Sequence, residues 1–238
     1  MTRTVKTPLA RAASKTGGDD GRSTRWSGHH ETRRAELVEA MVAAIDELGA
    51  TASIGDLAAA AGVSKPVLYR YFSDKADLHA AVGTWGAALV LERLTPSLVA
   101  TGSLRDRVDQ ATDTYLATIE EHPNVFLLLV QHRVDGDSDP LADGKAAIAA
   151  AIARVMGDAL RELGVDAAGA EPWAHGLVGL GLSTGEWWLT RRTMSRAAVS
   201  GYLSAFVWHA LEGISASYGV SVDTELRLVD PTPAEEQA

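Results

Sequence analysis

Residues 53–78 constrain the fold more than any other part of the chain. This segment holds three residues that can begin a helix and one glycine that can end one. It reads SIGDLAAAAGVSKPVLYRYFSDKADL. Ser53 and Ser64 are residue types that cap helix N-termini, and Gly62 between them is a residue type that ends helices. Pro66 is tolerated in the first turn of a helix, where an amide hydrogen would be unpaired anyway. The segment therefore predicts two short helices joined by a turn of about three residues.

Apolar residues at helical spacing precede and follow this segment. Before it, residues 30–49 carry such a run, and Gly49 is expected to end the helix. The apolar positions of the run are Leu37, Val38, Met41, Ile45 and Leu48. After the segment, Ser73 is expected to cap a further helix. Residues 30–80 are thus expected to form a three-helix unit of the helix-turn-helix type.

One face of the helix that starts at Ser64 carries basic and aromatic side chains. Leu68 and Phe72 lie four residues apart and are expected to face inward. The residues left on the outer side are Lys65, Pro66, Val67, Tyr69 and Arg70. The second helix of a helix-turn-helix presents one face to the DNA major groove while its other face packs on its partners. The pattern therefore favours a DNA-reading helix; the alternative for Tyr69 and Tyr71 is core packing with the hydroxyl in water.

Charge is distributed unevenly along a chain whose net charge is -9. Residues 1–34 hold eight basic and three acidic side chains, a local net charge of +5, and the remainder is strongly acidic. Such asymmetry suggests an end that binds a polyanion. Residues 1–29 are expected to form a flexible basic arm, in which Arg22 and Arg25 are the candidates for contact with a DNA minor groove. The alternative is a solvated tail without DNA contact.

The rest of the chain is also expected to be helical, which makes the fold class all-α. Helices are expected over residues 103–121, 123–132, 141–163, 171–192 and 195–218, with a loop over residues 134–140. Residues 81–222 are taken as a second, larger domain and residues 223–238 as a C-terminal tail.

Several classes of protein are disfavoured by what the chain lacks. It has no cysteine, no apolar signal-peptide core and no apolar run long enough to span a membrane, so we expect a cytoplasmic protein without membrane contact. The seven histidines show no metal-binding spacing, and neither a metal nor a cofactor is expected. Gly181, Ser183 and Gly185 match the G-x-S-x-G pattern of serine hydrolases, but that elbow needs a preceding strand, and we expect no enzyme. A protein-interaction module without DNA binding stays as an alternative.

The segment at residues 53–78 closely resembles the DNA-binding signature of TetR-type transcriptional regulators. The resemblance implies a homodimer, in which each subunit has an N-terminal three-helix DNA-binding domain and a variable C-terminal ligand-binding and dimerisation domain. It implies a double-stranded, palindromic DNA operator as partner and a repressor as the usual function. By position in the motif, the residues that approach base edges are Lys65, Pro66, Val67 and Arg70. Those that hold phosphates are Ser53, Ser64, Tyr69, Tyr71 and Lys75.

The C-terminal part carries apolar side chains suited to a cavity between helices. The expected pocket residues are Leu116, Phe126, Leu129, Trp173 and Leu177. The alternative is that these side chains fill the core and the dimer contact. GLVGLGLSTGEWWL at residues 176–189, followed by AVSGYLSAFVWHALEGI at residues 198–214, loosely resembles the last two helices of actinobacterial TetR-type regulators of lipid metabolism. That resemblance implies a small hydrophobic ligand, with acyl-CoA or fatty acid as the leading expectation.

The glycines of residues 176–185 suggest a close helix contact in a dimer. Each of Gly176, Gly179, Gly181 and Gly185 costs about 1 kcal/mol in a helix interior, which a close approach between helices can offset. Packing of the last two helices across a two-fold axis would give a four-helix interface. Glu186 is then expected to pair with a basic residue such as the partner subunit's Arg191 or to reach the rim of the interface.

Overall fold

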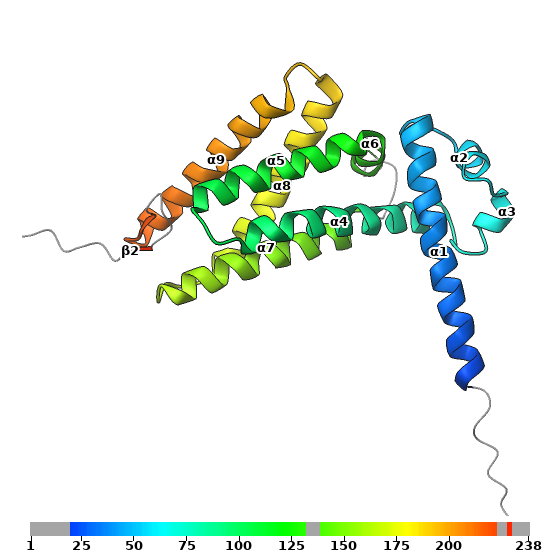
Figure 1. The fold of residues 1–238 in the computed structure, drawn as a ribbon, viewed down its shortest axis with the longest axis horizontal. Coiled ribbons are helices and arrows are strands. Elements are labelled where there is room, and N and C mark those ends of the chain that lie inside the picture. Colours follow the sequence, from blue (N-terminus) through cyan, green and yellow to red (C-terminus); the bar gives the residue numbers. More distant parts are fainter. Residues whose placement is uncertain (1–19, 132–138, 223–227, 230–238) are drawn as a thin grey trace, which may run out of the picture.

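The structure is a computed structural model that describes residues 20–131, 139–222 and 228–229. Nine helices and one short β-ladder account for the regular structure of these residues. The helices are α1 (Asp20–Leu48), α2 (Ile54–Ala60), α3 (Lys65–Leu68), α4 (Lys75–Val99), α5 (Leu104–Glu121), α6 (Pro123–Gln131), α7 (Ala142–Glu162), α8 (Ala170–Arg191) and α9 (Arg196–Ser217). Figure 1 shows α1–α3 at one end of an elongated molecule and α5, α7, α8 and α9 toward the other, with α4 running between them and α6 beside α1. The all-α class is confirmed.

The helix starts and stops expected around the turn are largely those observed. Gly49 and Gly62 have positive φ angles of 93° and 70°, the left-handed conformation that ends helices. Ser53 caps α2, because its hydroxyl oxygen accepts a hydrogen bond from the amide of Asp56 at 3.3 Å. Ser64 stands at the N-cap of α3 with extended backbone angles but, among the described residues, makes no side-chain capping bond.

The cap of α4 differs from the expectation by one residue. Asp74, not Ser73, occupies the N-cap, and its Oδ1 accepts a hydrogen bond from the amide of Asp77 at 2.8 Å. The amide of Ser73 donates to Oδ2 of Asp77 at 2.9 Å. The two acidic side chains together satisfy amides at the start of α4, so the serine hydroxyl is not needed there.

Helix α1 begins at Asp20, ten residues before the start expected from the sequence. The backbone of residues 20–29 is therefore helical, and the expectation of a flexible arm up to residue 29 is wrong for this part. These residues lack apolar periodicity because this end of α1 projects away from the rest of the molecule, as Figure 1 shows. Periodicity marks only the part of a helix that packs on a neighbour. The remainder of the arm, residues 1–19, lies outside the described residues.

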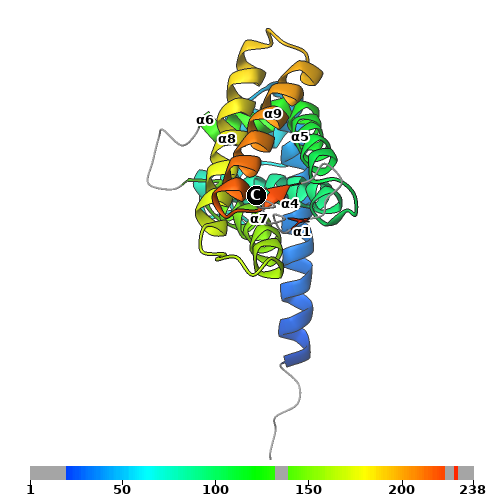
Figure 2. The ribbon, with the colours of Figure 1, turned by 90° about the vertical axis from the view of Figure 1, so that its left-hand side faces the viewer.

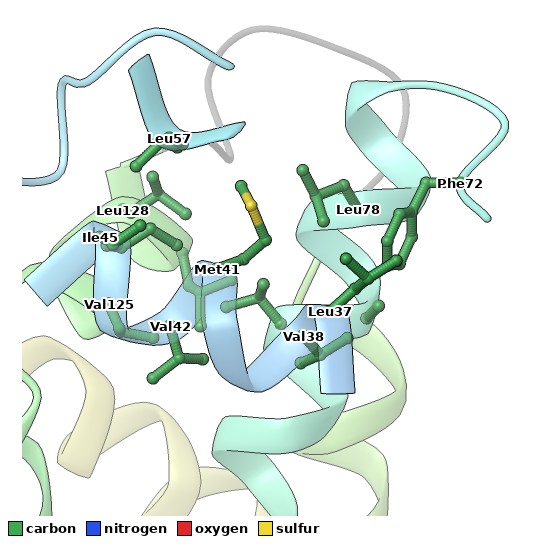
Figure 3. Packing of buried hydrophobic residues seen from close by; sticks show 14 of the residues in the cluster. Leu37, Val38, Met41, Val42, Ile45, Leu57, Phe72, Leu78, Val125 and Leu128 are labelled. Carbon is green, nitrogen blue, oxygen red and sulfur yellow. The ribbon is translucent and has the colours of Figure 1, made fainter. Parts of the chain in front are cut away.

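The core of the N-terminal unit extends into the second domain. Figure 3 shows Met41 of α1 pointing into the space between Leu57 and Leu78, and Ile45 lying beside Leu128 of α6. Helix α6 thus completes the core of α1–α4, and a boundary at residue 80 would cut α4 in its first turns. A unit of about 50 residues buries little apolar surface alone, which is the physical reason for sharing the core.

Helices α5, α8 and α9 form a second core. Its buried residues are Leu116, Ile119, Trp188, Leu189 and Val199. Figure 2 shows α8 and α9 side by side with α5, and α7 packs along α8 and α4. Residues 132–138, which include most of the expected loop, lie outside the described part of the chain. Every helix in the part that is described is too short or too polar to span a bilayer.

A two-stranded antiparallel ladder follows α9, where the sequence predicted no strand. β1 (Ser221–Val222) pairs with β2 (Leu228–Val229), so that Ser221 lies opposite Val229. β2 thus lies within residues 223–238, the segment expected to be a tail. Two-residue strands leave no alternating pattern in the sequence for a reader to detect.

Candidate DNA-reading face and ligand cavity

The outer face of α3 carries the side chains expected to read bases. Leu68 and Phe72 are buried, each 1% exposed, so α3 is anchored as the sequence predicted. The residues turned outward are exposed, except Val67, which is half-buried: Lys65, Pro66, Val67, Tyr69 and Arg70. This burial pattern leaves a short basic and aromatic surface with the shape that a major groove admits.

Residues expected to hold phosphates lie at the starts of α2, α3 and α4. Ser53, Ser64 and Lys75 are all exposed. A Cβ atom on Gly55 would lie 2.7 Å from Cε of Lys65 and 3.5 Å from the hydroxyl oxygen of Ser53. Gly55 therefore allows the lysine to cross the first turn of α2, which brings a cation and a hydroxyl together. Hydroxyl and ammonium groups of this kind are ordinary phosphate partners.

The two tyrosines of the segment have different surroundings. Tyr69 is 46% exposed, whereas Tyr71 is half-buried and packs against the core of α1–α4. The ring of Tyr71 lies 4.8 Å, centroid to centroid, from the ring of His30. The packing alternative thus describes the ring of Tyr71 and does not describe Tyr69.

A side chain that the sequence reasoning did not single out joins α1 to the end of α3. Arg34 donates from Nη2 to Oδ1 of Asp77 at 2.5 Å and from Nε to the backbone oxygen of Tyr71 at 3.3 Å. Its guanidinium carbon lies 4.7 Å from the ring centroid of Phe72. One arginine thereby fixes the turn between α3 and α4. We define these contacts of Arg34 with Tyr71, Phe72 and Asp77 as the arginine brace.

Helices α4, α5, α6, α7, α8 and α9 line a cavity of about 270 Å³ with mostly apolar walls. Phe126, Leu129 and Leu177, three of the five expected pocket residues, lie on its wall. Along α4 the lining runs from Trp85 to Leu98, which corresponds to about 20 Å at the rise of an α-helix. The cavity wall therefore extends along more than half of α4.

Leu116 and Trp173 do not line this cavity, which corrects two of the five expected pocket residues. Leu116 is fully buried on the other side of α5, against Trp188 and its neighbours in the second core. Trp173 covers Gly169, whose Cβ would meet the indole at 2.4 Å, and its ring stands edge-on to Tyr218. Both residues are apolar and lie on helices that line the cavity, but the rotation of these helices turns their side chains toward the second core and toward Tyr218.

Two large polar side chains on the cavity wall are already bonded within the protein. Arg107 donates from Nε to the backbone oxygen of Ser97 at 3.2 Å and also bonds the oxygen of Leu98, so it caps the end of α4. The hydroxyl of Tyr115 donates to the backbone oxygen of Gly181 at 2.8 Å, and burial raises its pKa above the ordinary value. Such walls favour a ligand whose buried part is hydrocarbon.

Comparison with known proteins gives two adjoining matches to family models. Residues 37–82 match the model of bacterial regulatory proteins of the tetR family, and residues 93–221 match that of the tetracyclin repressor-like C-terminal domain. Together they cover the outer face of α3 and most of the cavity wall. The chain belongs to the TetR family.

Similar proteins support the assignment along most of the chain. An HTH-type transcriptional regulator of Mycobacterium tuberculosis is 34% identical over 205 residues, 84% of this chain and 86% of that protein. The HTH-type transcriptional activator FasR of Mycolicibacterium smegmatis is 27% identical, over 90% of this chain and 98% of that protein.

Solved structures share the fold. A TetR-family regulator from Streptomyces coelicolor aligns with a TM-score of 0.62 at 26% identity, over 79% of this chain and 83% of that one. FadR from Bacillus subtilis, solved in complex with stearoyl-CoA, aligns with a TM-score of 0.57 at 13% identity, over 72% and 95% of the two chains. This TetR-family protein is accordingly a DNA-binding transcriptional regulator with a helix-turn-helix.

The G-x-S-x-G match has no hydrolase geometry in this TetR-family protein. Gly181, Ser183 and Gly185 lie in the middle of α8, so no strand leads into the serine. Gly185 instead makes room for α5 and α6, because a Cβ there would lie 2.7 Å from Cδ1 of Ile119 and 3.0 Å from Cζ of Phe126. The family is one of transcriptional regulators, not of enzymes. In the described part of the chain, no three acidic or histidine side chains gather as a metal site would require.

The four glycines of α8 divide into two pairs. Gly181 and Gly185 face Tyr115 and neighbouring side chains of the same subunit, so they serve packing within the subunit and not the dimer contact that the sequence suggested. Gly176 and Gly179 have no described atom within 4 Å of a Cβ position. Only this outer pair is available for contact with another molecule.

Two polar contacts of the regulator could not be predicted from the sequence. The arginine brace joins residues 34 and 77, and a second polar contact joins Asp46 of α1 to His122 at the end of α5. Each partner is a common surface residue type. No sequence signal marks these pairs, because 43 and 76 residues separate the partners.

Proposed function

We propose that this TetR-family regulator is a dimeric repressor that binds a palindromic operator and responds to a small hydrophobic ligand. The observation that carries the proposal is the combination of an exposed basic face on α3 with an apolar cavity in the same chain. In the complex, the base-reading side chains are Lys65, Pro66, Val67 and Arg70. The phosphate contacts come from Ser53, Ser64, Tyr69, Tyr71 and Lys75.

Arg22 and Arg25 are proposed to reach the adjacent minor groove. Their backbone belongs to the projecting end of α1, and their side chains lie outside the described residues. The negative potential of a narrow minor groove attracts such arginines. As a protein that acts on DNA, the regulator is proposed to work in the cytoplasm.

The dimer contact is proposed to lie on α8 and α9. Tyr202 and Phe206 of α9 are 69% and 64% exposed, a degree of exposure that is unusual for large apolar side chains next to one another on a helix. The outer glycines Gly176 and Gly179 of α8 allow a close helix approach. An isologous four-helix contact would cover these side chains in both subunits.

A long-chain acyl group, carried as acyl-CoA or as free fatty acid, is proposed as the ligand. The cavity is apolar, and its extent of about 20 Å along α4 suits an extended hydrocarbon chain. The complex of B. subtilis FadR with stearoyl-CoA is an example of this ligand class in a protein of the same fold. The ligand is proposed to favour a separation of the two reading heads that does not match half-sites about 34 to 36 Å apart.

Selection of sites from random DNA, followed by titration of acyl-CoAs and fatty acids into the operator complex, tests the proposal. We expect a near-palindromic consensus and a loss of operator affinity of roughly 5-fold to 150-fold on ligand binding. Free fatty acids of the same chain lengths distinguish the two carriers. A chain without DNA affinity at low salt would support the interaction-module alternative, and an operator affinity unchanged across the series would exclude lipids as ligands. A reporter gene behind the selected operator gives the sign of regulation.

A further inference from the structure

Asp46, in the last turns of α1, contacts the segment that links α5 to α6. Its Oδ2 lies 2.6 Å from Nδ1 of His122, and its backbone oxygen accepts a hydrogen bond from Nδ2 of Asn124 at 2.9 Å. The other carboxylate oxygen, Oδ1, is buried and has no hydrogen-bond partner among the residues that the structure describes. The imidazole is therefore the side-chain partner on which this carboxylate depends.

The same imidazole forms part of the cavity wall. His122 and Trp85 both line the cavity, and the indole of Trp85 stands edge-on to the imidazole, with ring centroids 5.1 Å apart and planes at 86°. On its other side, Nε2 of His122 lies 3.9 Å from Oε1 of Glu121. A molecule that fills this end of the cavity consequently touches the imidazole that contacts Asp46 and the indole that packs on that imidazole.

Loss of the imidazole contact would leave a partly buried carboxylate without a side-chain partner. A partly buried carboxylate that loses its partner is destabilised, so breaking the contact favours a position of α1 in which water replaces the imidazole. The side chain of Asp46 is 26% exposed, so a small shift of the end of α1 is enough to hydrate both carboxylate oxygens in the broken state. We call the contact between Asp46, His122 and Trp85 the polar junction. While it is made, it holds the end of α1 against the segment that links α5 to α6.

Movement of α1 would carry the reading helix with it. Buried side chains of α1 pack directly on those of α2 and of the turn that follows α3, as Figure 3 shows for Met41 near Leu57 and Leu37 near Phe72. Closely packed cores move as bodies and deform little. Release of Asp46 therefore tilts α1–α3 together relative to α5, and two such tilts change the separation of the reading heads in a dimer.

We propose that His122 is the residue through which an occupant of the cavity acts on the DNA-binding helices, by making or breaking its contact with Asp46. The inference rests on the proposed function, because it requires a ligand in the cavity and a response of DNA binding. It assigns His122 as a positioning residue for α1 and assigns no DNA contact to it.

The test compares His122→Leu with Thr118→Val, using stearoyl-CoA as the probe. Thr118 lines the same cavity one turn earlier on α5, and its hydroxyl bonds the backbone oxygen of Thr114 within the helix, so this variant alters the wall without touching α1. For each protein, calorimetry gives the stearoyl-CoA dissociation constant, and anisotropy gives the operator dissociation constant with and without saturating stearoyl-CoA. Asp46→Asn tests the junction from the side of α1.

We expect wild type and Thr118→Val to lose operator affinity at least fivefold with stearoyl-CoA. The stearoyl-CoA dissociation constant of His122→Leu should lie within about threefold of the wild-type value. Saturating stearoyl-CoA should change the operator affinity of this variant less than twofold. His122→Asn, which can place an amide donor near the position of Nδ1, should restore part of the response. A full response in both His122→Leu and Asp46→Asn would overturn the inference and leave the proposed function standing. A wild type that binds no stearoyl-CoA, or binds it without any change in operator affinity, would refute the proposed lipid response and the inference with it.

Discussion

The arginine brace should contribute measurably to stability, although its members lie near the surface. In Arg34→Gln the ion pair with Asp77 is lost; both side chains are 34% exposed, so solvent screening limits its value to about 0.5 to 1 kcal/mol. The hydrogen bond to the backbone of Tyr71 contributes about 1 kcal/mol and the contact with the Phe72 ring about 0.5 to 1 kcal/mol. The expected loss in the free energy of unfolding is about 2 to 3 kcal/mol.

The neighbouring arginine supplies a matched control. Arg33 pairs with Glu36 at 2.6 Å, but both side chains are half exposed and the pair lies within one helix. Arg33→Gln should therefore change stability by no more than about 0.5 kcal/mol. Both variants remove one positive charge from the same turn of α1, so their effects on net charge cancel in the comparison.

Thermal unfolding at fixed protein concentration measures the difference. For a chain of this size, 2 to 3 kcal/mol corresponds to a fall in Tm of about 4 to 12 °C. A double-mutant cycle with Asp77→Asn isolates the ion pair and should give a coupling energy of about 0.5 to 1 kcal/mol. Equal Tm values for Arg34→Gln and Arg33→Gln would refute the reasoning, because the brace would then be no better than an exposed pair.

Three further predictions concern DNA binding, pH and packing. The logarithm of operator affinity should fall with the logarithm of salt concentration with a slope on the order of -6 or steeper. Tyr69→Phe should weaken binding to all DNA sequences alike, whereas Arg70→Ala should mainly relax the preference for particular bases. Equal losses of affinity for specific and random DNA in Arg70→Ala would contradict the base-reading role of Arg70. The hydrogen bond from Arg93 holds the pKa of the Glu121 carboxyl below its ordinary value. The pair therefore stabilises the fold above the unfolded pKa of about 4.3, and this stabilisation is lost as the pH falls through the lower folded pKa. In Arg93→Gln, NMR titration should show the pKa of Glu121 rising toward its ordinary value, and an unchanged pKa would contradict the pairing. Gly185→Ala should destabilise the protein by about 1 to 2 kcal/mol although alanine has the better helix propensity, because the new methyl group overlaps the side chain of Ile119 in α5. A higher Tm in this variant would contradict the prediction and show that α5 can shift to accommodate the methyl group.

The helix-turn-helix could be predicted from the sequence because its signals are local. A capping serine at residue 53, a left-handed glycine at residue 62 and a proline in the first turn of α3 each act within a few residues of themselves. The inward spacing of Leu68 and Phe72 then decides which side of α3 faces out. Such short-range rules hold whatever the rest of the chain does.

The details of the cavity depended on how whole helices are rotated against one another. Leu116 and Leu177 look alike in the sequence, yet only Leu177 reaches the cavity, because α5 turns Leu116 toward Trp188. The glycines of α8 show the same limit, since Gly181 and Gly179 lie two residues apart but face a tyrosine and open space respectively. Periodicity gives an apolar face but does not say which neighbour covers which part of it.

The long-range polar contacts belong entirely to the tertiary structure. Arg34 meets Asp77 and Asp46 meets His122 only because α4 and α6 pack on α1, and the shared core that brings them together arises from apolar side chains far apart in the chain. The sequence by itself thus determined the helices around the turn, the cap at Ser53 and the outward face of α3, through interactions between near neighbours. The tertiary structure alone decided the cavity wall, the arginine brace and the polar junction, because these depend on the packing of helices whose residues are distant in sequence.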